Sequence, residues 1–384
     1  MAAATPASQD THACAHLASL RNGLEVALDH AGIATSAIRP LPDSGLAHAH
    51  FRLELLPARH DEAQEWIARL PKQSQMRLSA TENLAYQAAC FERCQPSHHT
   101  PRLEGALAPQ PALPRGGLLV EAIAGRAARL PEDLRAITEA LASIHALPLP
   151  AVHKRAPLLA PDCPWQSMLD EIEHQCRYLE SAGLTQEGHR LIESELQALR
   201  VFIAAQQAPA VISLISFDAH PGNFLIEEDR SGSAPPRAVL VDLEKCRYGL
   251  PGFDLAHATL YTSTTWDVAS HAILTPEQVA DAYRHWCQQM MATSAAPALH
   301  DSQTLLQARR AMWLWSLSWC AKWLSLNCET RDNGHHGEDW SSELSQDQLI
   351  AHVRERASHY LTEHCIRGVI DEWQQLARAL PRAI

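Results

Sequence analysis

A hairpin-like segment in the second half of the chain constrains the fold more than any other stretch. Two short apolar runs, residues 223–227 and 238–241, are separated by a polar stretch with one glycine and two prolines, which is typical of a β-hairpin. Asn223 is the first residue of the first run, Asp218 stands five residues before it, and Asp242 directly follows the second run. The sequence therefore predicts three oxygen-bearing side chains at strand edges, inside a region that is otherwise helical.

Three such side chains can gather around one hard cation. Mg²⁺ takes oxygen ligands and keeps several waters, so one or two protein side chains and the phosphates of a substrate complete its shell. Asn223 and Asp242 fit that need, which leaves Asp218 for a reacting hydroxyl. Phosphoryl transfer asks a protein mainly for positioning and charge neutralisation, and this set supplies the anionic groups. The alternative is a surface turn followed by a hairpin, because Pro-Gly-Asn is also a common turn composition.

The segment resembles the D-x-H-x-x-N catalytic loop, and the metal-binding Asp after it, of the aminoglycoside phosphotransferase and choline kinase superfamily. Residues 249–256 are similar to the G-x-P-x-x-D-L-A stretch of the same family. The resemblance implies an α+β, protein-kinase-like, two-lobed fold with a small antiparallel-sheet lobe and a larger, mainly helical lobe. It also implies roles for six residues: Asp218 and His220 in catalysis, Asn223 and Asp242 as Mg²⁺ ligands, Glu244 at the edge of the metal site, and Asp254 behind the catalytic loop.

One position departs from the family pattern. The family usually has His two residues before the catalytic Asp, where this chain has Ser216. That His braces the catalytic and metal loops. The departure therefore keeps open a second hypothesis, a catalytically weak, nucleotide-binding regulatory module on the same fold. A third is a metal-dependent hydrolase built on Asp218, His220 and Asp242.

The resemblance extends upstream to the nucleotide side of the site. Residues 66–71 resemble the third strand of the small lobe, so Arg69 is the expected phosphate-binding cation, with Lys72 as its substitute. Glu82 is the expected ion-pair partner of Arg69. Backbone groups of Glu121 and Ile123 are expected to bind adenine, and residues 43–48 stand where a phosphate-covering loop belongs. The alternative for Arg69 and Glu82 is a surface Arg on an edge strand and a Glu at a helix start.

Apolar spacing and breakers predict the organisation of the chain. A leading helix over residues 1–35 precedes a nucleotide-binding lobe over residues 36–120, and residues 121–384 form the hinge and a helical catalytic and substrate lobe. The predicted elements are helices at 11–33, 79–94, 132–146, 165–181, 186–207, 304–326 and 341–361, strands at 50–55, 65–70 and 117–123, and a loop at 107–114. The predicted small lobe has five strands.

Charge and composition narrow the possible partners. The net charge of −12, without a basic patch, argues against a nucleic-acid partner. The N-terminus lacks the pattern of a signal peptide, and Lys322 and three serines interrupt the most apolar stretch, residues 311–326, so no membrane span is predicted. Ten cysteines without a repeated C-x-x-C suit reduced thiols, and the expected location is the cytoplasm.

Two clusters have alternative interpretations. Cys90, Cys94, His98 and His99 can face one zinc ion, although the spacing of the two cysteines equally suits the buried face of a helix. Trp315, Trp319 and Trp323 recur at a spacing of four, which fits either an aromatic cage for a quaternary ammonium or a helix core.

The expected function is an ATP- and Mg²⁺-dependent kinase acting on a small-molecule hydroxyl acceptor. The sequence contains no signature of a P-loop, a dinucleotide-binding motif or a nucleophile elbow. Residues 333–340 form a polar stretch that either lines an acceptor pocket or faces solvent. The sequence is compatible with an aminoglycoside, an amino alcohol, a sugar or a hydroxy amino acid as the acceptor. It does not distinguish ATP from GTP, and it does not define the oligomeric state.

Overall fold

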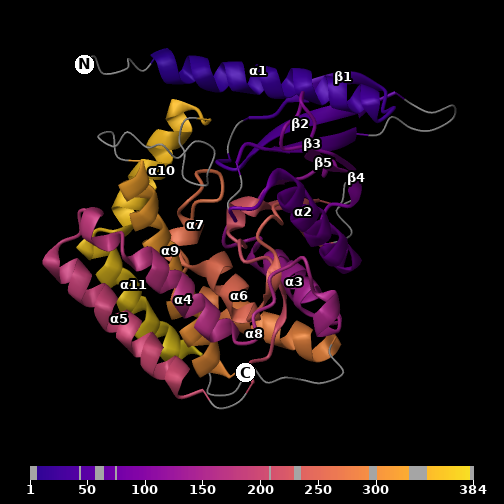
Figure 1. Ribbon diagram of the computed structural model, residues 1–384. Coiled ribbons are helices and arrows are strands. Elements are labelled where there is room, and N and C mark those ends of the chain that lie inside the picture. Colours follow the sequence, from indigo (N-terminus) through magenta and orange to yellow (C-terminus); the bar gives the residue numbers. More distant parts are fainter. Residues whose placement is uncertain are drawn as a thin grey trace. The chain divides into compact units, whose positions relative to one another are not determined.

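A computed structural model describes residues 7–42, 45–56, 65–73, 76–206, 209–228, 235–293, 301–327 and 344–380 (Figure 1). The chain divides into two compact units. Unit 1 consists of Met1–Glu92, Pro101–Ala122 and Leu326–Glu355, and unit 2 of Arg93–Thr100, Ile123–Ser325 and Arg356–Ile384. Each unit is described by itself.

Unit 1 is built on one antiparallel sheet of five strands, as the sequence predicts. The strand order is β1-β2-β3-β5-β4. The strands are β1 (Thr35–Pro40), β2 (His48–Leu55), β3 (Glu65–Pro71), β4 (Leu103–Leu107) and β5 (Gly117–Glu121). In the central part of β2, Phe51 and Leu53 are buried and the residues between and beyond them are half-buried, so the alternation read from the sequence is real. β1 and β4 had not been assigned from sequence, since β4 is short and contains Gly105.

The leading helix covers one face of this sheet. Helix α1 (Ala7–His30) buries Leu20, Leu24 and Leu28 in a cluster with side chains of β2 and β3, and Figure 1 shows it running along the sheet. Gly23 permits a close approach of the helix to the loop before β5, because a Cβ there would lie 2.0 Å from the carbonyl oxygen of Ala112. The predicted helix is therefore part of the unit 1 core.

Unit 2 is mainly helical. Its helices are α3 (Leu134–His145), α4 (Pro164–Cys176), α5 (Gln186–Ala204), α6 (Pro251–Thr259), α7 (Tyr261–Thr264), α8 (Pro276–Thr293), α9 (Ser302–Leu326) and α11 (Glu363–Ala379), and α10 (Asp347–Tyr360) ends in it. Thr185 and Thr362 cap α5 and α11 by accepting a backbone N–H three residues later. One cluster of buried side chains joins α4, α5, α6, α9 and α11. Helix α4 ends at Cys176, earlier than the predicted helix, and a single 3-10 turn follows at Leu179–Ser181.

The tryptophan stripe belongs to the core of unit 2. Trp313, Trp315 and Trp323 of α9 are at most 8% exposed. Trp315 also donates from Nε1 to Glu171, 2.8 Å away. These residues therefore follow the helix-core interpretation. No helix in the described ranges has the length and hydropathy that a membrane span requires.

Two small sheets interrupt the helices and carry the predicted hairpin. Strands β8 (Phe224–Glu227) and β9 (Arg237–Leu240) pair antiparallel, with Phe224 opposite Leu240, and β6 (Arg126–Ala127) joins β8. Strand β7 (Ser213–Ile215) pairs with β10 (Arg247–Gly249). The chain thus leaves β7, passes through residues 216–223 and enters β8, so this loop is held by a sheet at each end.

Candidate active site

The loop after β7 is anchored from behind by a buried carboxylate. The backbone N–H groups of Ser216 and Phe217 donate to the two oxygens of Asp254, at 2.7 and 2.8 Å. Asp254 lies in the first turn of α6 and is 0% exposed. The expected position of Asp254 behind the catalytic loop is confirmed.

A histidine and a tryptophan complete the surroundings of Asp254. His145 Nε2 lies 3.1 Å from Asp254 Oδ2, and Trp286 Nε1 lies 3.0 Å from His145 Nδ1. The indole N–H is a donor only, so Nδ1 of His145 must accept and Nε2 carries the proton that is donated to Asp254. All three side chains are buried. The carboxylate therefore accepts a third hydrogen bond, from His145, in addition to the two from the loop.

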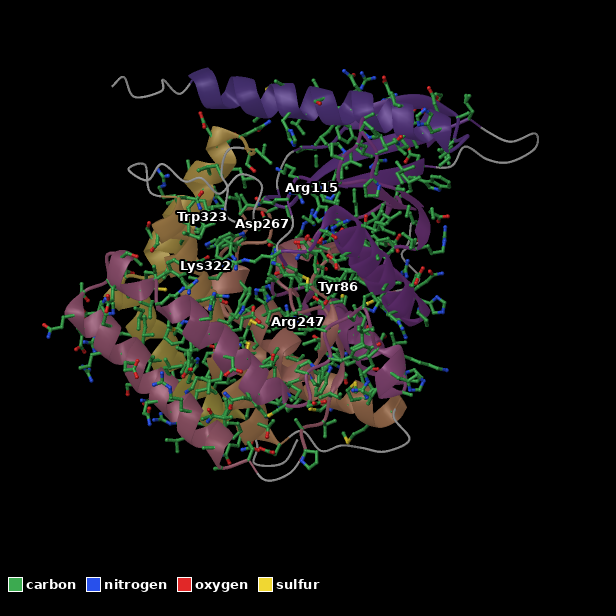
Figure 2. The ribbon with its side chains drawn as sticks, in the orientation of Figure 1. Tyr86, Arg115, Arg247, Asp267, Lys322 and Trp323 are labelled. Atoms are coloured by element: carbon green, nitrogen blue, oxygen red, sulfur yellow. The ribbon has the colours of Figure 1, made fainter. Side chains whose placement is uncertain are left out.

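Phe217 forces a sharp turn in the loop. Its φ is +61°, a left-handed conformation that residues other than glycine adopt at a cost. The ring packs edge-on against Phe253 and Trp315, and the guanidinium of Arg247, labelled in Figure 2, lies 3.6 Å from the ring centroid. Arg247 in turn pairs with Glu171 at 3.2 Å. Aromatic packing and a cation–π contact thus stabilise the turn that positions the Asp218 side chain.

Ser216 occupies the position of the family's His and braces the loop differently. Its hydroxyl oxygen accepts the backbone N–H of Asp218 at 3.0 Å, while its own N–H is bound to Asp254. The side chain is completely buried. A small hydroxyl therefore provides a local brace next to Asp218.

Asp218 is nearly buried and carries a charged partner. Its Oδ2 accepts from Lys245 Nζ at 2.7 Å, and the two side chains are 13% and 15% exposed. Burial by itself raises the pKa of Asp218, but Lys245, with smaller contributions from His220 and His257, outweighs it and the pKa lies below its ordinary value. Burial likewise opposes the charge of Lys245, while Asp218 and nearby carboxylates raise the pKa of Lys245 well above its usual range. Both groups are therefore ionised at neutral pH.

The other oxygen of Asp218 faces an imidazole. His257 of α6 places Nδ1 3.7 Å from Asp218 Oδ1, and its side chain is 9% exposed. Burial lowers the pKa of His257 to about 4, so the ring is neutral at physiological pH. The ring of His220 lies beside it, with the centroids 6.0 Å apart. Oδ1 thus faces the neutral ring of His257, while Oδ2 is held by an ammonium.

The two expected metal ligands are held side by side by the hairpin. Asn223 immediately precedes β8 and its Nδ2 donates to the carbonyl of Asp218 at 2.8 Å, which leaves its Oδ1 as the possible ligand. The backbone N–H of Val241 donates to the carbonyl of Asn223 at 2.9 Å, so Asp242 is adjacent. An amide oxygen and a carboxylate beside the Asp218 loop fit Mg²⁺, which prefers oxygen ligands. The hairpin thus places the backbone of Asn223 beside residues 241 and 242, and Asp218 lies near enough to Asp242 and His220 for their charges to act on it.

Gly222 allows an acidic side chain to approach the same loop. A Cβ on Gly222 would lie 2.4 Å from Asp267 Oδ2 and 2.9 Å from His220 Cε1. Figure 2 labels Asp267, which follows α7. The Asp267 carboxylate and the His220 ring therefore flank one point of the loop, and only glycine leaves room for both.

The candidate nucleotide residues of unit 1 are placed in part as expected. Arg69 is a buried residue of β3, and its guanidinium lies 5.6 Å from the centroid of the Phe91 ring. Lys72 donates to Ser345 at 3.2 Å. The N–H of Glu121 donates to the carbonyl of Arg102 at 3.0 Å.

Glu82 makes local contacts at the start of a helix. Its carboxylate accepts from both the hydroxyl and the N–H of Ser79, at 2.6 and 3.1 Å, and the Ser79 hydroxyl accepts the N–H of Glu82 in return. This reciprocal capping box starts helix α2 (Ala80–Cys94), and these hydrogen bonds lower the pKa of Glu82. These contacts match the alternative interpretation of Glu82, a Glu at a helix start.

The zinc alternative does not fit the contacts of its residues. Cys94 Sγ lies 3.8 Å from Cys246 Sγ, and His99 Nδ1 donates to the carbonyl of Ala238 at 2.8 Å. Burial and the neighbouring thiol raise the pKa of Cys94 far above its ordinary value, which disfavours a thiolate ligand. Of the remaining expectations, Asp43, Ser44 and residues 333–340 lie outside the described residues.

Three residues near Asp218 were missed from the sequence: Lys245, His257 and Asp267. Lys245 and His257 each follow an expected site residue by three positions, Lys245 after Asp242 and His257 after Asp254. In a helix, a spacing of three keeps two side chains on one face, so His257 could have been found once α6 was assigned. Lys245 and Asp267 reach the site by turns, for which the sequence has no comparable signal.

Comparison with known proteins agrees with this geometry. Residues 58–298, more than half of the chain, match the sequence model described as the phosphotransferase enzyme family. No curated protein matches the chain.

Solved structures share the fold. A putative aminoglycoside phosphotransferase from Ralstonia eutropha JMP134 superposes with a TM-score of 0.56 and 13% identity, covering 90% of this chain and 98% of that one. Spectinomycin phosphotransferase APH(9)-Ia, solved with ADP and spectinomycin, superposes with a TM-score of 0.55 and 10% identity. The match covers 90% of this chain and 95% of that one. Choline kinase from Cryptosporidium parvum Iowa II superposes with a TM-score of 0.52 and 12% identity. The match covers 88% of this chain and 91% of that one. The fold is therefore protein-kinase-like, and the chain belongs to the phosphotransferase enzyme family.

Proposed function

We propose that this protein is an ATP- and Mg²⁺-dependent kinase that phosphorylates a hydroxyl of a small molecule. The observation that carries the proposal is the position of Asp218, whose loop is fixed by Asp254 from behind and by Asn223 from the hairpin. Family membership supports the same reaction class. A hydrolase in which Asp218 ligates a metal is less compatible with the 2.7 Å contact between Asp218 Oδ2 and Lys245.

Each residue has a proposed part in the transfer. Asn223 Oδ1 and the Asp242 carboxylate hold Mg²⁺, which neutralises charge on the nucleotide phosphates. Asp218 Oδ1 accepts the proton of the acceptor hydroxyl, because Oδ2 is engaged by Lys245. The low pKa of Asp218 keeps it ionised, so it is able to orient the hydroxyl at neutral pH.

The nucleotide contacts are proposed from unit 1 and the segment that follows it. Arg69 is the proposed cation for the phosphates. The N–H of Glu121 is already engaged, so its carbonyl and the N–H of Ile123 are the backbone groups proposed for adenine. Glu82 contributes by capping α2.

The acceptor is proposed to be a neutral or cationic hydroxylated molecule, such as an aminoglycoside or an amino alcohol. The net charge of −12 and the carboxylate of Asp267 beside the catalytic loop both disfavour a polyanionic acceptor. The similar structures include an aminoglycoside phosphotransferase and a choline kinase, so aminoglycosides and choline are the first acceptors to test.

The test is nucleotide consumption by the purified chain over a panel of hydroxylated metabolites and aminoglycosides, with ATP and GTP in parallel. We expect Asp218→Asn to abolish turnover and keep the thermal midpoint, and Asp242→Ala to lose the magnesium-dependent part of nucleotide affinity by calorimetry. Turnover by Asp218→Asn at near the wild-type rate would remove Asp218 from the mechanism. Nucleotide binding without turnover of any acceptor would favour the regulatory alternative.

A further inference from the structure

His257 is a buried polar residue that the proposed reaction does not yet use. Its Nδ1 is buried, and within the described part of the chain it has no hydrogen-bond partner. Leaving a buried ring nitrogen without a partner costs free energy, so such an atom calls for an explanation. The position of Nδ1, 3.7 Å from Asp218 Oδ1, supplies one.

The distance between these atoms suits a bridging oxygen. At 3.7 Å the two atoms are too far apart for a direct hydrogen bond, which needs about 2.7–3.2 Å. One hydroxyl oxygen is able to lie within hydrogen-bonding distance of both. Asp218 Oδ2 is occupied by Lys245, so Oδ1 is the oxygen that receives a hydroxyl proton. A reacting hydroxyl held by Oδ1 would therefore lie next to Nδ1.

Electrostatics selects the tautomer of His257. A carboxylate only accepts hydrogen bonds, so a lone pair on Nδ1 would face the negative charge of Asp218. The neutral ring therefore carries its proton on Nδ1. Other charged or titratable groups that act on His257 are His220, Lys245 and Asp254, and burial keeps the ring neutral among them.

We propose that His257 is a catalytic residue that holds the acceptor hydroxyl together with Asp218. This inference rests on the proposed kinase function and deepens it. His257 Nδ1–H donates to the hydroxyl oxygen, and the hydroxyl proton moves to Asp218 Oδ1. The freed electron pair forms the bond to the γ-phosphorus. The bond between that phosphorus and the β–γ bridging oxygen breaks, and ADP leaves with its electrons. His257 keeps its proton throughout and fixes the direction of attack.

The first experiment reads the tautomer without any turnover. The full-length chain is labelled with ¹⁵N in its histidines, and long-range ¹H–¹⁵N correlation spectra are compared for the wild type and His257→Gln, which assigns the His257 signals. We expect a neutral ring protonated at Nδ1. A ring protonated at Nε2, or one charged at pH 7, overturns the proposal.

The second experiment compares two isosteric variants with Mg-ATP, using water and then each active compound of the panel as acceptor. Asn places its amide nitrogen where Nδ1 stands, whereas Gln places it at the position of Nε2. We expect His257→Gln to lose roughly tenfold in kcat, the effect of one hydrogen bond to the nucleophile, and His257→Asn to lose clearly less because it keeps a donor at that position. The KM for ATP should not change in either variant.

The control and the contradicting outcomes separate this inference from the proposed function. His285→Gln is a matched control, because His285 has a 12% exposed side chain and bonds Glu139. It should keep the wild-type kcat. Equal losses in His257→Asn and His257→Gln, or no loss in either, overturn the proposal. If the wild type consumes no nucleotide with any acceptor, the proposed kinase function fails. The NMR measurement of the His257 tautomer then still tests whether Nδ1 carries the proton.

Discussion

Replacing Asp254 should damage both the stability of unit 2 and the position of the catalytic loop. The carboxylate accepts three hydrogen bonds, from the N–H groups of Ser216 and Phe217 and from His145 Nε2, and it is 0% exposed. Water therefore cannot replace it. Asp254→Ala leaves two backbone N–H groups buried without acceptors, and Asp254→Asn keeps one acceptor oxygen.

The magnitude follows from these bonds. A hydrogen bond to a charged group contributes about 1.5–3 kcal/mol to stability. Loss of all three bonds in Asp254→Ala thus lowers the free energy of unfolding by roughly 4.5–9 kcal/mol, and loss of one in Asp254→Asn by roughly 1.5–3 kcal/mol. Because a typical domain has only about 5–15 kcal/mol in total, the Ala variant should be close to unfolding.

The assay is urea unfolding at neutral pH, followed by tryptophan fluorescence, which reports mainly on unit 2 because most tryptophans lie there. The kcat of the Asn variant is measured where it is fully folded, and it should fall because the loop loses an anchor. Asp281→Asn is the control, because Asp281 is 70% exposed on α8 and its pair with Arg284 should contribute less than about 1 kcal/mol. An Asp254→Ala variant as stable as this control would refute the reasoning.

Three further substitutions test the surroundings of Asp218. Lys245→Met removes the ammonium that keeps the pKa of Asp218 low against burial, so the acid limb of kcat/KM against pH should move to higher pH; an unchanged limb contradicts this. In the wild type, the stabilisation from the Asp218–Lys245 pair is present at neutral pH and is lost as the pH falls through the folded-state pKa of Asp218. The difference in urea stability between the wild type and Lys245→Met should therefore be largest at neutral pH. Gly222→Ala places a methyl group 2.4 Å from Asp267 Oδ2, and we expect a lower kcat with a small change in thermal midpoint; a normal kcat would show that Asp267 can move aside. Ser216→His restores the family residue in a fully buried position, where overpacking costs about 1–3 kcal/mol, so both melting temperature and kcat should fall; a gain in kcat would show that the Ser is a defect.

The sequence predicted the parts of the site that depend on local pattern. The hairpin was readable because the two short apolar runs and the turn residues between them are local, and the hairpin in turn places Asn223 beside Asp242. The contact of Lys245 with Asp218 depends on how the turn after Asp242 folds back across 27 positions, which no periodicity encodes. His257 was missed for a similar reason, since its role depends on α6 packing behind the loop.

The contacts of Glu82 with Ser79 were also readable from local pattern. Ser79 and Glu82 have the S-x-x-E spacing of a capping box directly before an apolar helix, so the sequence contained the signal. The family resemblance suggested a longer-range role for the same carboxylate. The local interaction formed because Glu82 lies in the first turn of α2, where free N–H groups attract it.

The pairing of β8 with β9 has an evolutionary consequence. The distance from Asn223 to Asp242 is set by Phe224 lying opposite Leu240, and not by the number of residues that join the strands. A slip of a single position would turn the Asp242 side chain to the opposite face of the sheet. Descendants of this gene are therefore free to gain or lose residues in the connection after Glu227, whereas an insertion inside either strand would separate the two oxygen donors.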